Sequence, residues 1–311
     1  MADEVVLSPW EGARTTARVK LHDETLRDGL QNPTAADPTV EQKIEIVHLL
    51  DDIGIDSVNI GLPAAGPRPY ADCIAVAQAM ADGKLTIRAA GAARTLVDDI
   101  GPMADVTQKT GVTMEVMTFI GSSPIRRYVE GWSVELIRER SVAAIAFGVK
   151  EGLPVTYVTE DTTRTPPHVL RELFMAAIDA GAHRLCLCDT VGHATPDGAR
   201  NIVQFTRNLI EGMGVDVGID WHGHDDRGFA LANALAAMEA GADRIHGCVL
   251  GVGERVGNTS LELLLRNLEH SGKLAHWRTA RLPELCERVL EATRFPARPD
   301  NPYVGPDRPT R

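Results

Sequence analysis

Short apolar runs rich in β-branched residues alternate along the chain with longer stretches whose apolar residues recur at helical spacing. The short runs are typical of buried strands, and the longer stretches are typical of amphipathic helices. The pattern predicts eight strands, at 19–22, 57–61, 86–90, 113–119, 155–159, 184–188, 217–222 and 244–248. The helices predicted between them include 40–52, 70–81, 134–151, 168–180, 196–211 and 229–240.

Several predicted helices end in a glycine just before the next strand, namely Gly54, Gly152, Gly181 and Gly241. Glycine readily takes the left-handed conformation that ends a helix and turns the chain back. Eight strand–helix units in about 270 residues are typical of a (β/α)8 TIM barrel, which is an α/β fold. A doubly wound open sheet is the main alternative.

The end of the chain differs from this alternation. We expect residues 1–272 to form the TIM-barrel catalytic domain, and residues 273–311 to form a C-terminal helix and a short proline-rich arm, with no regulatory domain. The helix is predicted at 283–293, and the closely spaced prolines after it exclude regular structure. The arm would pack on the barrel or on a second subunit.

Polar residues gather just past the predicted strands, at the face where a barrel carries its chemistry. Asp28 follows the first strand, Glu160 and Arg164 the fifth, Thr195 the sixth, His222 and His224 end the seventh, and Glu254 and Asn258 follow the eighth. Random surface placement would not collect them in this way. These strand ends are therefore the predicted site.

His222 and His224 flank a glycine and are followed by two aspartates. Residues two apart on a strand point to the same side, so both imidazoles can bind one metal ion. Together with the Asp28 carboxylate they suit Zn²⁺, Mn²⁺, Mg²⁺ or Fe²⁺, and Asn258 can add a carbonyl oxygen. The alternatives are a polar strand end without a metal and, for Asp28, a loop cap or an ion pair with Arg27.

Three further residues have roles that follow from their chemistry. Arg27, beside the predicted metal, can stabilise a developing oxyanion, or it is a surface charge. Glu160 can move a proton or hold a substrate hydroxyl, or it forms a salt bridge to Arg164. Thr195 opens a helix, where a hydroxyl and free N–H groups can hold a carboxylate, or it is an ordinary N-cap.

The composition limits the kinds of partner and the cell compartment that we expect for this protein. The 311 residues carry a net charge of −11, which leaves no basic stripe for nucleic acid. The first residues lack the apolar core of a signal peptide, and no apolar run is long enough to span a membrane, so we expect a cytoplasmic protein. Five irregularly spaced cysteines favour free thiols. Cys186 and Cys188 are expected to be small core residues, with a thiolate metal site as the alternative.

A metal with open positions beside an arginine can bind a 2-oxo acid through its keto oxygen and carboxylate. The carbonyl is then polarised for attack by a carbon nucleophile, or for the reverse cleavage. Aldol or Claisen chemistry follows from this arrangement, and metal-assisted hydrolysis is possible on the same ligands.

Several motifs occur in an order that resembles a known family. Leu26-Arg27-Asp28-Gly29-Leu30-Gln31, His222-Gly223-His224 and residues 251–258 are similar to the metal-dependent Claisen-condensing and lyase barrels. These include 2-isopropylmalate, homocitrate and citramalate synthases and hydroxymethylglutaryl-CoA lyase. The likeness covers residues 17–305, and the segments 122–125, 160–164, 189–196 and 253–258 most resemble 2-isopropylmalate synthase.

The resemblance implies an acyltransferase barrel, expected to be a homodimer, that condenses acetyl-CoA with a 2-oxo acid. It implies that Asp28, His222 and His224 hold a divalent cation (Mg²⁺, Mn²⁺ or Zn²⁺), with Asn258 nearby or ligating. The catalytic residues expected on this basis are Arg27, Glu160 and Glu254, and the substrate-binding residues are Gln31, Asn59, Arg164 and Thr195.

Four features depart from the family pattern. Leu30 stands where synthases usually carry glutamate and favours the lyase. Asn59 stands near the substrate where strand two often has glutamate, and Asp225 replaces the usual asparagine. The chain ends soon after Gly305, without the helical region and feedback domain of long synthases. Leucine inhibition is therefore not expected, and the base that removes the acetyl proton is unassigned.

The leading hypothesis is a metal-dependent acyltransferase of the 2-isopropylmalate synthase type. The alternative is a lyase or aldolase of the hydroxymethylglutaryl-CoA lyase type, although Cys248 is followed by Val249 where that lyase has Pro-Tyr. A third hypothesis is a barrel that has lost catalysis and serves as an assembly or regulatory subunit.

Overall fold

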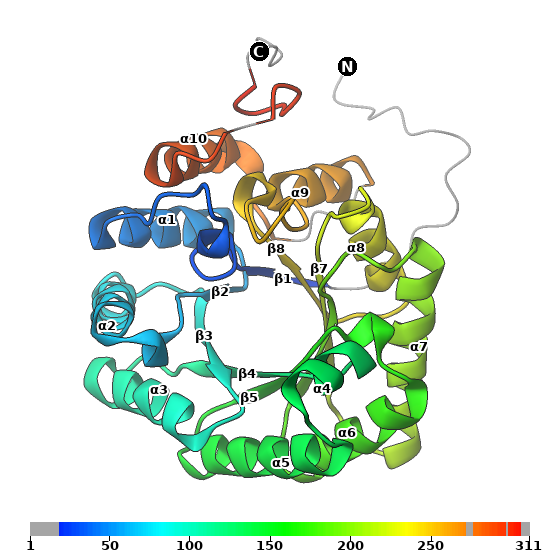
Figure 1. The fold of residues 1–311 in the computed structure, drawn as a ribbon. Helices are drawn as coiled ribbons and strands as arrows, with labels where there is room; N and C mark the ends of the chain where they lie inside the picture. The colour runs from blue at the N-terminus through cyan, green and yellow to red at the C-terminus, as the bar shows by residue number, and fades with distance from the viewer. Residues whose placement is uncertain (1–18, 272–275, 297, 306–311) are drawn as a thin grey trace.

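The computed structural model describes residues 19–271, 276–296 and 298–305. Eight parallel strands follow one another around a closed barrel, and the last strand pairs with the first. The helices lie outside the strands (Figure 1). The structure therefore confirms the predicted (β/α)8 barrel and excludes the open doubly wound sheet.

All eight predicted strands are present, with shifts of a few residues at their ends. They are β1 (Lys20–Asp23), β2 (Ser57–Asn59), β3 (Arg88–Arg94), β4 (Glu115–Gly121), β5 (Val155–Glu160), β6 (Arg184–Asp189), β7 (Gly218–Gly223) and β8 (Arg244–Gly247). The prediction misplaced β3, which consists mostly of alanine and glycine and so carries little local preference for a strand. Pairing with β4, which matches Arg94 with Phe119, sets its actual end.

The six predicted helices are also present. The helices are α1 (Val40–Ile53), α2 (Pro67–Asp82), α3 (Val97–Thr110), α4 (Pro124–Glu130), α5 (Val134–Lys150), α6 (Pro167–Asp179), α7 (Pro196–Met213), α8 (Ala230–Glu239), α9 (Leu261–His270) and α10 (Leu282–Thr293). The prediction did not name α3, which contains Gly101 and Pro102, or the short α4 and α9. Each of the four glycines predicted to end a helix has a positive φ, for example 92° at Gly54.

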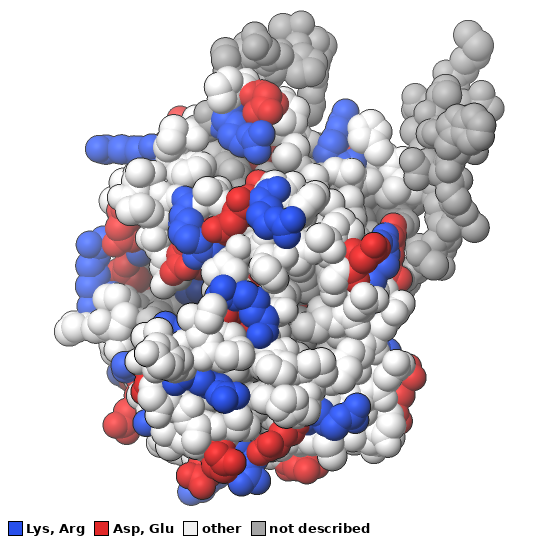
Figure 2. Space-filling model, turned by 45° about the vertical axis from the view of Figure 1, so that its right-hand side comes forward, with Lys and Arg blue, Asp and Glu red and all other residues white. Residues whose placement is uncertain are grey.

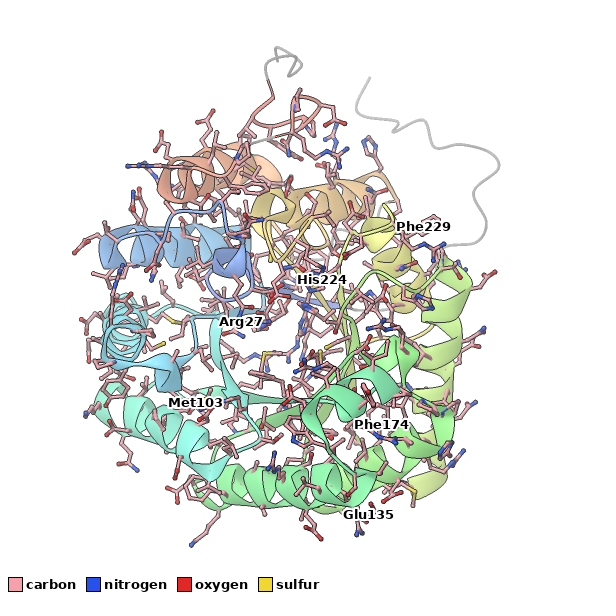
Figure 3. The ribbon with its side chains drawn as sticks, in the orientation of Figure 1. Arg27, Met103, Glu135, Phe174, His224 and Phe229 are labelled. Atoms are coloured by element: carbon pink, nitrogen blue, oxygen red, sulfur yellow. The ribbon has the colours of Figure 1, made fainter. Side chains whose placement is uncertain are left out.

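The apolar core lies between the strands and the surrounding helices. Met103 and Phe174 are fully buried there, whereas Glu135 lies at the periphery (Figure 3). Positive and negative side chains are interspersed on the face shown in Figure 2. Among the described residues, no helix combines the length and apolar character needed to cross a membrane.

A buried ionic cluster fills the inside of the barrel near the amino ends of the strands. Arg244 donates to Asp220 through Nε at 2.8 Å and to Glu115 through Nη1 at 2.8 Å. Burial works to raise the pKa of both carboxyls, but Arg244 outweighs it and holds both well below their usual range. This cluster cross-links strands β4, β7 and β8 beneath the mouth of the barrel.

The segment that follows the barrel contains α10, which matches the helix predicted at 283–293. The backbone N–H of Ala36 donates to the carbonyl of Thr293 at 2.6 Å. Further on, Asn301 donates to the buried carboxylate of Glu262 at 2.9 Å. These contacts hold the described part of the predicted arm against α9 and the loop before α1. The predicted boundary at residue 273 lies outside the described residues.

We expect Arg244→Met to lower the free energy of unfolding by about 3–5 kcal/mol, because it leaves buried carboxylates without their cation. Urea denaturation followed by circular dichroism measures this change. Arg266→Met is the matched control, since Arg266 pairs with Glu269 at the surface and should contribute little. Equal, small losses in both variants would contradict a structural role for the cluster.

Candidate metal centre

A pocket of about 190 Å³ opens inside the barrel at the carboxyl ends of the strands. Arg27 and His224 both lie at this opening (Figure 3). One wall is polar and comes mainly from β1, β7, β8 and the loops after them, and it carries Glu24, Arg27, Asp28, Gln31, His222, His224, His246 and Glu254. The pocket is thus where most of the predicted site residues meet.

The three predicted metal ligands converge on this polar wall. His222 lies in β7 and His224 follows that strand, while Asp28 lies in the turn after β1. The Nε2 atoms of the two histidines are 3.2 Å apart. Oδ2 of Asp28 is 3.7 Å from the first and 3.6 Å from the second. All three side chains are buried.

These distances fit a shared divalent cation. Metal–nitrogen bonds of about 2.0–2.1 Å place neighbouring ligand atoms roughly 2.8–3.4 Å apart in octahedral or tetrahedral shells. The observed separations of 3.2–3.7 Å need little adjustment to meet this range. Two facing Nε2 atoms can share at most one proton, whereas a cation satisfies both lone pairs and the carboxylate together.

The protonation states of the same three groups favour the binding of a cation. Burial lowers the pKa of His222 to about 3 and also lowers the pKa of His224, so both imidazoles are neutral near pH 7. Burial works to raise the pKa of Asp28, but Arg27 and the two histidines outweigh it and lower the value. The site therefore offers one carboxylate and two neutral nitrogen donors.

Asn258 lies beside the Asp28 carboxylate of this group. Its Nδ2 contacts the Asp28 carboxylate and donates to Cys248 Sγ at 3.0 Å, while its Oδ1 is buried without a hydrogen-bond partner. Rotating the amide by 180° exchanges these two atoms. Oδ1 would then face the Asp28 carboxylate, and a cation between the two oxygens would make that arrangement favourable.

Arg27 is held beside the ligands by a carboxylate that was not among the predicted site residues. Its Nε donates to Glu24 at 2.8 Å, and its Nη1 contacts Asp28 at 3.3 Å and Gln31 at 3.2 Å. Asn59 donates to the other oxygen of Glu24 at 3.3 Å. Burial works to raise the pKa of Glu24, but Arg27 outweighs it and keeps the group ionised.

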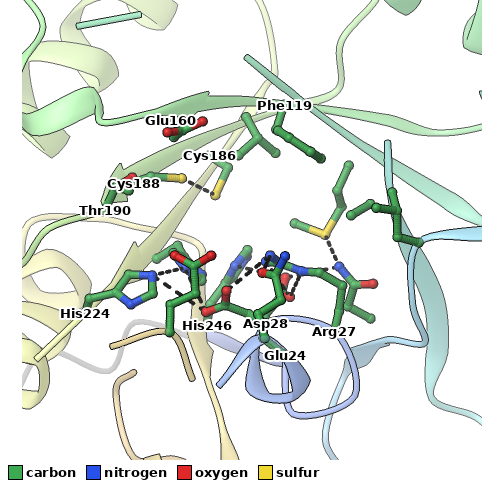
Figure 4. Close-up of a pocket in the computed structure, with 18 residues that line it drawn as sticks. Glu24, Arg27, Asp28, Phe119, Glu160, Cys186, Cys188, Thr190, His224 and His246 are labelled. Atoms are coloured by element: carbon green, nitrogen blue, oxygen red, sulfur yellow. Dashed lines mark hydrogen bonds and ion pairs between the residues drawn. The ribbon is translucent and has the colours of Figure 1, made fainter. Parts of the chain in front are cut away.

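Glu160 (Figure 4) and Glu254 line the pocket with partly exposed side chains, which places them at its rim. The alternative proposed for Glu160, a salt bridge to Arg164, is wrong, because its oxygen lies 3.1 Å from Nε of Arg126 instead. Burial raises the pKa of Glu160, while Arg126 works in the opposite direction. Glu254 pairs with Arg255 at 3.1 Å.

Two predicted substrate-binding residues lie outside the lining of this pocket. The guanidinium of Arg164 pairs with Asp161 at 2.7 Å. Thr195 Oγ1 accepts the backbone N–H of Gly198 at 3.3 Å, which is an ordinary N-cap of α7. The structure therefore brings Gln31 and Asn59, but not these two residues, to the metal ligands.

Sequence reasoning missed two residues of the polar wall, Glu24 and His246. His246 lies in β8, and its Nε2 is 3.1 Å from Asp220. Alternation along a strand could have found it, because residues two apart share a face and Arg244 already points into the barrel. A polar residue at an inward-facing position of a barrel strand is the sign that was overlooked.

The opposite wall of the pocket is apolar. It is formed by strands β3, β4 and β5 and the loop after β2, and it consists of Leu62, Ala92, Met117, Phe119 and Val158. Among the residues that line the pocket, the positively charged side chain is Arg27, which already pairs with Glu24. This wall therefore favours an uncharged group and offers no partner to a second carboxylate.

The HMGL-like family model matches residues 18–289 of the chain. The chain is 33% identical over 305 residues to a 2-isopropylmalate synthase of Methanocaldococcus jannaschii, which covers 97% of this chain and 56% of that protein. It is 35% identical over 288 residues to a putative (R)-citramalate synthase, CimA, of Methanopyrus kandleri, covering 92% and 54%. The chain thus spans about half the length of these curated relatives.

Solved structures give the same fold. The HMG-CoA lyase of Pseudomonas aeruginosa superposes with a TM-score of 0.73 at 21% identity, covering 89% of this chain and 94% of that one. The lyase of Acinetobacter baumannii, in complex with coenzyme A and 3-methylmalate, gives 0.73 at 19% identity, covering 91% and 93%.

We expect the chain to bind one Mn²⁺ ion at this centre and His224→Ala to weaken that binding by more than about 100-fold, since a ligand is lost. Calorimetric titration of metal-stripped protein measures the affinity. His183→Ala is the control, because His183 lies at the opposite end of the barrel, just before β6. Equal binding by both variants would rule out His224 as a ligand.

Proposed function

The chain belongs to the HMGL-like family, and on this premise we propose that it is a metal-dependent acyltransferase that condenses acetyl-CoA with a 2-oxo acid. The observation that carries the proposal is the convergence of Asp28, His222 and His224 beside Arg27. Relatives named 2-isopropylmalate, homocitrate and citramalate synthases support this choice of reaction. A homodimer is part of the same proposal.

Asp28, His222 and His224 would hold the cation, with Asn258 as a fourth candidate ligand. When bound, a divalent cation of this kind supplies Lewis acidity towards a carbonyl oxygen. Mg²⁺, Mn²⁺ and Zn²⁺ all suit the donor set.

Arg27 would bind the keto oxygen and stabilise the negative charge that develops there during attack. Its guanidinium is fixed by Glu24, and Asn59 in turn fixes Glu24. A donor held in place before the reaction needs no reorganisation when the charge appears. Gln31, which accepts from the same guanidinium, lies where it can contact the substrate.

Glu160 and Glu254 lie at the entrance, where the acyl-CoA thioester would arrive. The raised pKa of Glu160 suits a group that accepts and holds a proton at the rim of a partly dry pocket. We therefore assign Glu160 a supporting proton-holding role, with Glu254 beside it.

The side chain of the 2-oxo acid would lie against the apolar wall. A second carboxylate there would lack a cationic partner and would approach the carboxylates at the rim. We therefore propose an acid with an uncharged, apolar side chain, such as 2-oxo-3-methylbutanoate, in preference to 2-oxoglutarate.

Mixing the protein with Mg²⁺ or Mn²⁺, acetyl-CoA and a panel of 2-oxo acids is expected to release free CoA thiol, and a thiol-reactive dye measures the rate. Asp28→Asn should lower this rate to background while Arg266→Met leaves it unchanged. Absence of thiol release with every acid would refute the condensation. Cleavage of a 3-hydroxyacyl-CoA instead would support the lyase, which Leu30 favours.

Val158→Lys is expected to shift specificity towards 2-oxoglutarate. A new ion pair at this wall should contribute about 1.5–3 kcal/mol, which corresponds to roughly a tenfold to hundredfold change in the kcat/KM ratio of the two acids. Val158→Met is the matched control, because it adds similar length without charge. An equal shift in both variants would show that size, and not charge, decides the preference.

A further inference from the structure

Two thiols face the pocket from one strand beside the metal centre. Cys186 and Cys188 lie two residues apart on β6, and both line the pocket. Their Sγ atoms are 3.8 Å apart (Figure 4). In the register of β6 and β7, Cys188 is matched with His222. The pair was expected to be ordinary core, but it opens onto the pocket next to a proposed metal ligand.

A disulfide is a poor explanation for this pair. Residues two apart on a strand have Cα atoms about 6.5–7 Å apart, at or beyond the long end of the range that disulfides span. The sulfurs would also have to close from 3.8 Å to a bonded distance of about 2.05 Å. A strand paired on both sides resists such a movement.

The separation of the sulfurs matches a different chemistry. With zinc–sulfur bonds of about 2.3 Å, two sulfurs of a tetrahedral site lie roughly 3.8 Å apart. The thiols of Cys186 and Cys188 are therefore already at the edge length of such a site. We propose that they form a second cation site, for a thiophilic divalent ion such as Zn²⁺ or Cd²⁺, distinct from the centre at Asp28, His222 and His224.

Cys186, but not Cys188, also belongs to a cluster of three potential metal ligands. The ligand atoms of Cys186, Asp220 and His246 all lie within 4.8 Å of one another. Asp220 is already held by Arg184 and Arg244, which makes it the less available of the two. Nδ1 of His246 makes no hydrogen bond and lies 3.8 Å from Glu24, so this ring is the better candidate for a ligand beside Cys186.

Binding is a simple exchange of protons for a metal ion. Each thiol loses one proton to solvent, two sulfur–metal bonds form, and no atom is oxidised or reduced. Burial raises the pKa of the Cys186 thiol, so the proton is present before the metal arrives. Soft thiolates select Zn²⁺ and Cd²⁺ over Mg²⁺ and Mn²⁺, which prefer oxygen donors. An ion here would occupy space between the two walls and inhibit the enzyme.

The test is a titration of the Mg²⁺-loaded protein with Cd²⁺, followed by the ultraviolet charge-transfer absorption of thiolate–cadmium bonds. We expect the wild type to show this absorption, and Cys186→Ser and Cys188→Ser to lose it or need at least about 100-fold more Cd²⁺. Cys286→Ser, in α10 and away from the pocket, is the matched control and should keep it.

Further variants separate this site from the metal centre. His224→Ala should retain the absorption, because the thiol pair does not use that residue. Absence of the band in the wild type, or its persistence in both serine variants, would overturn the proposal, as would its loss in Cys248→Ser alone. The readout needs no turnover, so a failure of the proposed acyltransferase reaction would be seen separately in the thiol-release assay.

Discussion

The pairing of β8 with β1 closes the barrel, and the site depends on this closure. The register matches Leu21 with Ile245 and so joins segments from opposite ends of the barrel sequence. This pairing brings the turn after β1, which contains Asp28, close to the end of β7. The Asp28 carboxylate therefore lies within 3.7 Å of His222 and His224. If the same strand order were left open, β1 and β8 would be separate edges, and the carboxylate would lie far from the imidazoles. The closed strand order is therefore what brings the side chains of the pocket together.

Inside the barrel, an arginine lies between two carboxylates in each of two layers. Arg244 lies between two buried carboxylates near the amino ends of the strands, and Arg27 lies between Glu24 and Asp28 near the mouth. In the lower layer, positive and negative groups satisfy one another, which makes it a cross-link. In the upper layer, Asp28 also faces two neutral imidazoles whose Nε2 atoms face each other. The upper layer therefore retains the capacity to bind a cation at Asp28, His222 and His224, which separates its function from the support given by the lower layer.

Much of this arrangement could be predicted from the chain itself. Strand periodicity indicated the barrel, and the spacing of His222 and His224 indicated a shared direction, because both are local properties of an extended strand. Glu24 could not be placed in the same way, since its role depends on contacts with Arg27 and with Asn59 from another strand. The substrate role of Thr195 stays a prediction, because a helix start has a local use for its hydroxyl that needs no substrate.

The soft thiols of β6 lie one strand away from the harder imidazole and carboxylate donors, with Cys188 in register with His222. The identity of the metal that binds should therefore affect the activity. A hard ion such as Mg²⁺ can bind at the carboxylate and imidazoles without engaging sulfur. Zinc can bind at either place, so the thiols of β6 would compete with the histidines for it. If the catalytic ion is hard, the thiol pair makes zinc an inhibitor. If it is zinc, the pair becomes a neighbouring reservoir, and activity should depend on the zinc supply in two phases instead of one.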